Sequence, residues 1–303
     1  MAPDIDGVLS HADASRRGFL RKLIAGAAFA PPLLASFSLD GLSLTAADAV
    51  QSVCANATVP VGGSFPGGQC FDFSGNQYAA NFRDVLRGGD INAGPDLGFG
   101  THPALNFTGS AGAAGSTWAT VLDVTPADTV PGPVFPDLSV ALEADILFHK
   151  FNNTKSVGLL TAAFDLVGGN GLALLLTDAG NTDRLDLVTV DTSGKIAPVT
   201  GASVSLGSGI AENAWYRLVM EVRAARCLGP SCGALVVGQV FTHLTPSDPT
   251  SDLGAQVGAS LIFPATLTSS GGGSGQVGIV GRAISAEIGA SVTNFCVSAC
   301  QTT

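Results

Sequence analysis

From residue 66 onward, apolar and polar residues alternate along the chain with a period of two. The clearest example is the stretch 138–151, LSVALEADILFHKF. One set of alternating positions is apolar: Leu138, Val140, Leu142, Ala144, Ile146 and Phe148. The other set carries Ser139, Glu143, Asp145 and His149. Because successive side chains of a strand point to opposite faces, the pattern predicts a strand with one buried face and one face toward water.

Further segments combine this alternation with β-branched residues, and turns rich in Gly, Asn or Asp separate them. They are 155–166, 171–177, 184–191, 214–224, 233–244, 274–283 and 290–297. The stretches 167–171 and 177–183 have the composition of hairpin connections, and 50–68 and 86–115 that of surface loops. Many strands with close turns, and no convincing amphipathic helix among them, predict an all-β, antiparallel sandwich or barrel that forms one domain over 50–303.

Composition fits this picture and narrows the partners. Of the 303 residues, 46% are apolar and only 13% are charged, which favours a well-buried globule over a disordered chain. The formal net charge is −10, and no basic stripe is present. Nucleic acid is therefore not an expected partner.

The N-terminal 49 residues have the order of an export signal. A cationic block that begins with Arg16 and Arg17 precedes a mostly apolar, uncharged stretch, 23–39, which Pro31 and Pro32 make a poor membrane span. The sequence SRRGFLRK resembles the twin-arginine translocation signal, which implies export in a folded state to the periplasm, the cell surface or the medium. Residues 47–49, Ala-Asp-Ala, fit a cleavage site, so 1–49 is expected to be a signal containing a helix that meets the membrane only in transit. The alternative is a basic patch before a buried helix.

All six cysteines lie beyond this cleavage site, and an even count in an exported segment predicts disulfides. The spacings do not suit a zinc finger. Cys227 and Cys232 flank a Gly-Pro turn that would bring them together. The other four, Cys54, Cys70, Cys296 and Cys300, allow three connectivities. Either the chain turns after Val297 to pair the last two, or these two clasp Cys54 and Cys70.

Five segments, in order, resemble concanavalin A-like lectin/glucanase jelly rolls of the laminin-G type. They are DLSVALEADILF, GNGLALLLTDAGNTDRLDLVTVD, NAWYRLVMEVR, SGQVGIVGRA and ASVTNFCVS. The stretch CFDFSGN looks like the opening strand of that family, which lies beside the closing strand and so implies the terminal cysteine clasp. The resemblance implies a jelly roll over about 70–297. It also implies that Trp215, rather than Tyr216, faces the core; Trp118 is expected in the core as well.

Glucanases on this fold carry three carboxylates on one strand, as Glu-x-Asp-x-(x)-Glu, so that all line one groove. Here Glu143 and Asp145 match the first two, but Leu147 and Phe148 stand where the third acid would be. The catalytic set is incomplete, so both acids are expected to be ordinary residues of the water-facing side, or part of a ligand-binding groove together with His149. His102, His149 and His243 are each expected on the surface or in loops.

Calcium is a candidate cofactor, because domains of this family often bind it and because oxygen ligands cluster in two stretches. One holds Asp90, Asn92 and Asp96, and the other Asp178, Asn181 and Asp183. Neither matches an EF-hand loop. The alternative is that these side chains form turns.

Together these observations predict an exported, non-catalytic module that binds a glycan or a cell-surface partner on one sheet. Two alternatives stay open: a glycoside-active enzyme that uses Glu143 and Asp145, and a structural or adhesive component of the cell envelope.

Overall fold

The computed structural model describes residues 69–87, 90–108, 117–122, 140–149, 155–163, 171–179, 182–191, 193–224, 231–243, 253–268, 276–283 and 289–299. All of them belong to one compact unit, Val50–Thr303. They form two antiparallel β-sheets and one short helix, α4 (Gln77–Asn81). None of the described helices is long and apolar enough to cross a membrane.

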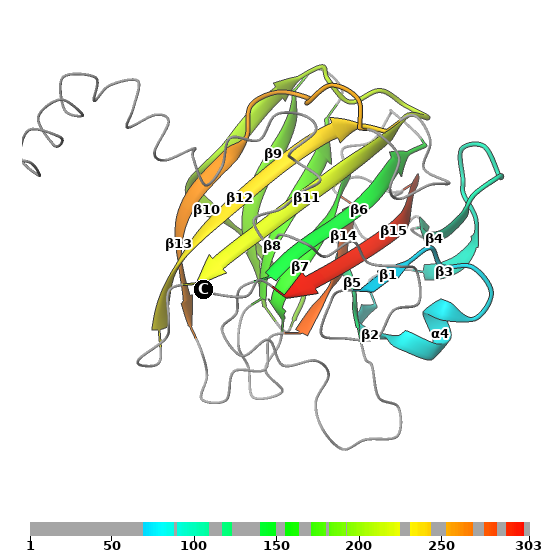
Figure 1. Ribbon diagram of the computed structural model, residues 1–303, viewed down its shortest axis with the longest axis horizontal. Coiled ribbons are helices and arrows are strands. Elements are labelled where there is room, and N and C mark those ends of the chain that lie inside the picture. Colours follow the sequence, from blue (N-terminus) through cyan, green and yellow to red (C-terminus); the bar gives the residue numbers. More distant parts are fainter. Residues whose placement is uncertain are drawn as a thin grey trace, which may run out of the picture. The chain divides into compact units, whose positions relative to one another are not determined.

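The larger sheet, sheet A, has eight strands. Its path runs β13 (Leu261–Thr268), β12 (Ser231–Thr242), β11 (Trp215–Ala224), β6 (Val140–Phe148), β15 (Gly289–Ala299), β4 (Pro103–Thr108) and β3 (Asp90–Pro95). The eighth strand, β1 (Gln69–Phe71), pairs with β15 beyond the end of β4 (Figure 1). The first and last described strands are therefore neighbours.

The smaller sheet, sheet B, has seven strands. Its order is β10 (Ile196–Gly207), β9 (Asp183–Val190), β8 (Gly171–Asp178), β7 (Lys155–Ala163), β14 (Gln276–Ala283), β5 (Thr117–Leu122) and β2 (Phe82–Arg87). Every strand pair in both sheets is antiparallel, and strands distant in sequence lie side by side, such as β14 between β5 and β7. The prediction of an all-β antiparallel jelly-roll sandwich is confirmed.

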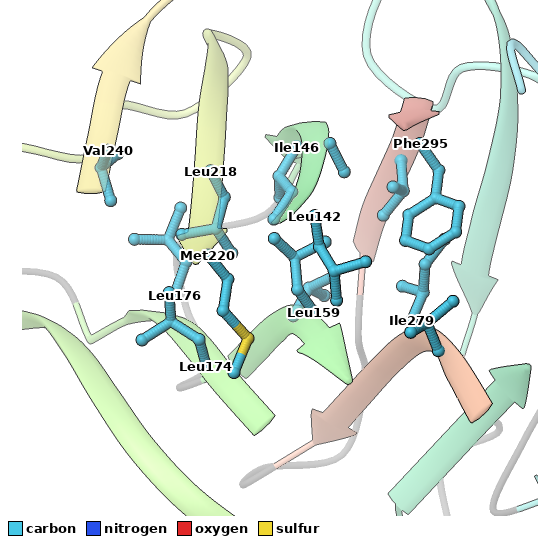
Figure 2. Close-up of a cluster of buried hydrophobic side chains, with 14 of the residues drawn as sticks. Leu142, Ile146, Leu159, Leu174, Leu176, Leu218, Met220, Val240, Ile279 and Phe295 are labelled. Atoms are coloured by element: carbon cyan, nitrogen blue, oxygen red, sulfur yellow. The ribbon is translucent and has the colours of Figure 1, made fainter. Parts of the chain in front are cut away.

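The main hydrophobic core lies between the sheets. Figure 2 shows Leu142, Ile146, Leu218, Met220 and Val240 of sheet A pointing toward leucine and isoleucine side chains of sheet B. The even-numbered residues of β6 belong to this core, as the alternation in 138–151 predicts. Trp118 is also in the core, and only 1% of it is exposed.

Sheet B is largely apolar on its outer face as well. A second buried cluster there comprises Ala119, Val121, Leu160, Ala173, Leu175, Val188, Val190 and Val280. Leu86 of β2 and Ile196 of β10, from the two edges of the sheet, also pack against it. Leu86 also lies beside Gly194, in the turn between β9 and β10, so the two edges approach each other on this side. This outer face also carries polar groups, since Asp186 of β9 accepts hydrogen bonds from Thr177 and Ser203.

Several predicted loops are strands. The stretch 86–115, expected to form surface loops from its Gly, Pro and Asn content, contains β3, β4 and the end of β2. β3 tolerates this composition because it is an edge strand, where proline and glycine break few ladder hydrogen bonds. β10 and β13, which also lie at sheet edges, are strands that the alternation pattern does not predict.

One disulfide joins the first and the last described strands, β1 and β15, within sheet A. Cys70 of β1 and Cys296 of β15 are bonded and directly opposite each other in the ladder, which confirms the predicted clasp at this pair. The predicted roles of Cys54, Cys227 and Cys300, and of Arg16 and Arg17 in the export signal, fall outside the described residues. Cys232 lies in β12, but its side chain is not among those described.

Candidate functional site

The outer face of sheet A carries a cluster of charged and amide side chains. Because Leu142, Ala144 and Ile146 face the core, Glu143 and Asp145 lie on the opposite face of β6. Asp145 is directly across from Arg217 of β11 on one side and from Thr293 of β15 on the other. Sheet register therefore sets an arginine beside an aspartate.

Both carboxylate oxygens of Asp145 are fully engaged. Arg217 donates from Nε to Oδ1 at 2.6 Å and from an Nη to Oδ2 at 2.9 Å, a bidentate ion pair. His243 Nδ1 lies 2.8 Å from Oδ1, and Asn294 Nδ2 donates to Oδ2 at 2.6 Å. None of these four side chains is more than 3% exposed. Asp145 is the centre of a buried, saturated hydrogen-bond network.

A β-bulge supplies the asparagine. The pairing of β15 with β6 shifts between Thr293 and Cys296, and Asn294 has a left-handed backbone conformation with φ 50°. Before the bulge Val292 faces the core, and after it Phe295 does, so Thr293 and Asn294 both face outward. A bulge re-aims a side chain in this way, and Asn tolerates the left-handed region better than most residues.

Arg217 also links Asp145 to Glu143, because its other Nη donates to Glu143 Oε2 at 3.3 Å. Glu143 differs from the rest of the group: 17% of its side chain is exposed. The name carboxylate cluster is used below for Glu143, Asp145, Arg217, His243 and Asn294. Glu143 is its contact with solvent.

The two acids of the cluster have opposite pKa shifts. Burial raises the pKa of Glu143 above its ordinary value, and the attraction of Arg217 only partly offsets this. Burial also acts to raise the pKa of Asp145, but Arg217 and His243 outweigh it and hold the pKa below its ordinary value. Asp145 therefore stays ionised to lower pH than an ordinary aspartate, and Glu143 is the acid that gains a proton more readily.

This shift predicts a pH dependence of stability. Below the ordinary carboxyl pKa of 4.5, Glu143 is protonated whether the chain is folded or unfolded. As pH rises toward the higher pKa of the folded state, the unfolded chain releases the proton first, so the free energy of unfolding falls. We expect Glu143→Gln to remove this fall. The measurement is urea unfolding of both proteins between about pH 4 and pH 8.

Asp191→Asn is the matched control. Hydrogen bonds from Ser193 and Lys195 lower the pKa of this exposed carboxyl, so it stabilises the fold above its ordinary pKa of 3.8 and loses that effect as pH falls further. The difference in free energy of unfolding between Asp191→Asn and the wild type should therefore change only at acidic pH. If the difference in free energy of unfolding between Glu143→Gln and the wild type is constant from about pH 4 to pH 8, the raised pKa of Glu143 is contradicted.

The structure corrects one expectation about this face: Asp145 is not a water-facing residue, because none of its surface is exposed. His243 lies in a loop, directly after β12, but it is buried and bound to Asp145. Its backbone N–H donates to Trp215 O, which holds it against the start of β11.

His149 does not join the cluster. It follows the last residue of β6, and its Nδ1 lies 3.0 Å from Asn213 Oδ1. His102 is half-buried in the turn between β3 and β4. Its ring packs edge-to-face with the ring of Trp215, and the two ring centroids are 6.0 Å apart.

The resemblance-based assignment of Trp215 to the core is wrong. Tyr216 belongs to the core between the sheets, and its hydroxyl accepts a hydrogen bond from the backbone N–H of Ala211. Trp215 lies on the outer face of sheet A, where only 5% of it is exposed. The alternation predicts that one of the pair faces inward, but it does not say which.

Three of the calcium candidates, Asp96, Asp178 and Asp183, have other partners. Both carboxylate oxygens of Asp96 accept backbone N–H groups, from Phe99 and Gly100 on one oxygen and from Thr101 and His102 on the other. These bonds hold the pKa of Asp96 below its ordinary value although burial opposes them. Asn92 is exposed on β3, and the side chain of Asp90 is not described.

In the second stretch, Asp178 forms a buried ion pair with Lys155, with Nζ and Oδ2 3.5 Å apart. Asp183 accepts the backbone N–H groups of Ala179 and Ile210. Asn181 lies outside the described residues. Within the described part of the chain, no three His, Cys, Asp or Glu side chains gather in a way that would hold a metal ion.

Comparisons with known proteins give no family assignment. No family model matches the sequence, and no curated protein matches it. Among solved structures, a legume lectin-like domain from Entamoeba histolytica is similar at 9% identity and a TM-score of 0.41, over 72% of this chain and 89% of that one. The PL-14 alginate lyase from Aplysia kurodai is similar at 12% identity and a TM-score of 0.40, over 69% and 87%.

A third similar structure is the carbohydrate-binding module CBM66 from Bacillus subtilis, at 10% identity and a TM-score of 0.35, over 72% of this chain and 94% of that one.

Proposed function

We propose that this protein is an exported, non-catalytic glycan-binding module and that the outer face of sheet A receives the sugar. The observation that carries the proposal is the difference between the two acids of the carboxylate cluster: Asp145 is buried and fully hydrogen-bonded, and Glu143 is partly exposed. Both carboxylate oxygens of Asp145 are bound by Arg217, His243 and Asn294. Glu143 is held beside Asp145 by Arg217, and part of its side chain reaches solvent. A carboxylate fixed by a buried network and open on one side is suited to accept hydrogen bonds from sugar hydroxyls.

Neutral polar groups extend this surface on the same side of the sheet. Gln239 of β12 lies in the same row as Glu143, separated from it by Val219 of β11. Its Nε2 donates to Ser260 Oγ at 3.0 Å, and Gln256 Nε2 donates to the same hydroxyl at 3.1 Å. Gln239 is buried, whereas Ser260 and Gln256 are half-buried, so amide and hydroxyl groups reach solvent beside β12, the second strand from the acid. Such groups recognise hydroxyls without requiring charge on the ligand.

The amino-acid sequence supports the exported part of the proposal through the arginine pair Arg16–Arg17 and the apolar stretch after it. The bonded Cys70 and Cys296 fit the same setting, because disulfides persist in oxidising compartments.

A glycan array probed with residues 50–303 tests the proposal, once with calcium and once with a chelator. For a glycan that binds, we expect Glu143→Gln to weaken the affinity about tenfold or more, because a hydrogen bond to a charged acceptor contributes about 1.5–3 kcal/mol. Asp191→Asn, an acidic residue beside sheet B, should leave the affinity unchanged. Affinity that is the same for Glu143→Gln and the wild type rules out this site.

One observation favours a second candidate function, a glycoside-active enzyme. Two neighbouring carboxyls whose pKa values are pushed apart are typical of an acid and its partner, and the raised pKa of Glu143 suits a proton donor. The saturation of Asp145 argues against it, because a nucleophile or base needs a free oxygen. Release of reducing ends from the glycans that bind, lost in Glu143→Gln, would establish hydrolysis. The same rate in both proteins excludes Glu143 as the acid.

A further inference from the structure

The turn between β3 and β4, residues 96–102, is held rigidly although it is a surface loop. The carboxylate of Asp96 accepts four backbone N–H groups from within the turn, two on each oxygen. Two backbone hydrogen bonds close it as well, from Asp96 N to His102 O and from Gly100 N to Asp96 O. Loops restrained in this way lose little conformational entropy when they bind a ligand.

This turn rests directly on the outer face of sheet A. Leu97 N donates to Ser291 Oγ of β15 at 2.9 Å. Gly98 lies so close to β6 that a Cβ added there would be 3.0 Å from Leu147 Cδ2 and 3.2 Å from Asn213 Oδ1. The turn is therefore packed closely against the row next to Asp145, and a Cβ at position 98 would require the side chains of Leu147 and Asn213 to shift by a few tenths of an ångström.

Phe99 follows Gly98 and is exposed. With 55% of its surface accessible, it is one of two large apolar side chains that the described residues expose, and Ile262 on the opposite edge strand of the sheet is the other. An exposed phenylalanine adds little to the stability of the fold, because most of its apolar surface stays in contact with water. An aromatic ring held in this way offers a flat apolar surface for a ligand.

Polar side chains lie beside Gly98, the residue that precedes Phe99. Asn213 is exposed and in a left-handed conformation with φ 54°, and its Oδ1 lies 3.0 Å from His149 Nδ1, from which it accepts a hydrogen bond when that nitrogen is protonated. Its backbone N–H is bonded to Phe148 O, which fixes the residue at the end of β6. Because Asn213 Oδ1 is also the neighbour of Gly98, the amide–imidazole pair lies against the same turn that carries the exposed Phe99.

We propose that Phe99, Asn213 and His149 form a second sugar-contact subsite, which takes a pyranose unit with its apolar face on Phe99 and its hydroxyls toward Asn213 and His149. The inference rests on the proposed function and extends it to a ligand class. Leu147, under the turn, is four residues along β6 from Glu143, or ~13 Å at the rise of a strand. A ligand that uses both sites is therefore an oligosaccharide rather than a monosaccharide.

The test compares Phe99→Ala with Ile262→Ala, which removes the other exposed apolar side chain, in titrations of residues 50–303 with the oligosaccharide that an array identifies and with its monosaccharide unit. We expect Phe99→Ala to weaken oligosaccharide binding about tenfold, a loss typical of an aromatic anchor, and to leave monosaccharide binding at Glu143 unchanged. Ile262→Ala should affect neither. Phe99→Trp should retain affinity and change its fluorescence when the ligand is added.

The outcomes separate this inference from the proposed function. If Glu143→Gln weakens binding and Phe99→Ala does not, the subsite is wrong and the proposed function stands. If Phe99→Ala weakens binding and Glu143→Gln does not, the subsite stands and the role of Glu143 is wrong. Equal effects of Phe99→Ala and Ile262→Ala overturn the subsite, and a wild-type protein that binds no glycan overturns both.

Discussion

Replacing Cys70 and Cys296 together by alanine will lower the free energy of unfolding by about 5 kcal/mol, because the bond restricts a very long loop in the unfolded chain. The two residues are 226 positions apart, and this bond holds β1 against β15. Such a loss is as large as the whole stability of many domains, so the variant should unfold at much lower urea concentration. Urea unfolding followed by tryptophan fluorescence gives the difference.

The single variant Cys70→Ala is the matched control. One cysteine alone forms no bridge, so this variant should lose as much stability as the double variant and should also present a thiol at the half-buried Cys296. A double variant within about 1 kcal/mol of the wild type would show that the clasp does not restrict the unfolded chain as expected.

Arg217→Met will destabilise the fold by about 3–5 kcal/mol, the usual result of removing one partner of a buried ion pair. The methionine fills similar volume, but it leaves Asp145 as a buried anion whose remaining partners are His243 and Asn294. The loss should come mainly from this uncompensated charge. Adding Asp145→Leu to Arg217→Met should therefore restore part of the stability, although it removes a second polar group.

Arg184→Met provides the comparison for this variant. Arg184 pairs with Asp186 at 3.6 Å, but 51% of the arginine side chain is exposed. A pair this open contributes less than about 1 kcal/mol. Should Arg217→Met cost no more than Arg184→Met, the carboxylate cluster would not be the tightly coupled network described above.

The sequence predicts the strands wherever one face alternates cleanly with the other. The stretch 138–151 indicates β6 and the face on which Glu143 and Asp145 lie, because the alternation of side chains is a local property of a strand. β3 is different: its sequence, DINAGP, holds glycine and proline, and its strand character comes from pairing with β4. Propensity is overridden there by tertiary context.

The partners of Asp145 are less accessible from sequence. Arg217 is 72 residues away, Asn294 is 149 residues away, and only sheet register places them beside the same carboxylate. The bulge that turns Asn294 outward depends on a register shift between β15 and β6, which alternation alone does not reveal. One signal was present in the sequence: Arg217 lies on the polar face of the strand 214–224, so it is a candidate partner for the acids on the polar face of 138–151.

Burial of the outer face explains why Asp145 is not exposed as the alternation predicts. A period-two pattern tells which residues share a face, but it does not tell whether that face is covered. The turn at 96–102 lies on this face through contacts with Leu147 and Ser291, and its sequence gives no sign of them.

The most direct test of the central claim, that a glycan binds on the outer face of sheet A, is a map of backbone amide NMR shifts of the complex. Addition of the glycan should shift amides at and around Glu143 and Gln239, while amides of β8 and β9 in sheet B stay in place. Shifts confined to sheet B, with those around Glu143 unmoved at saturation, would contradict the account.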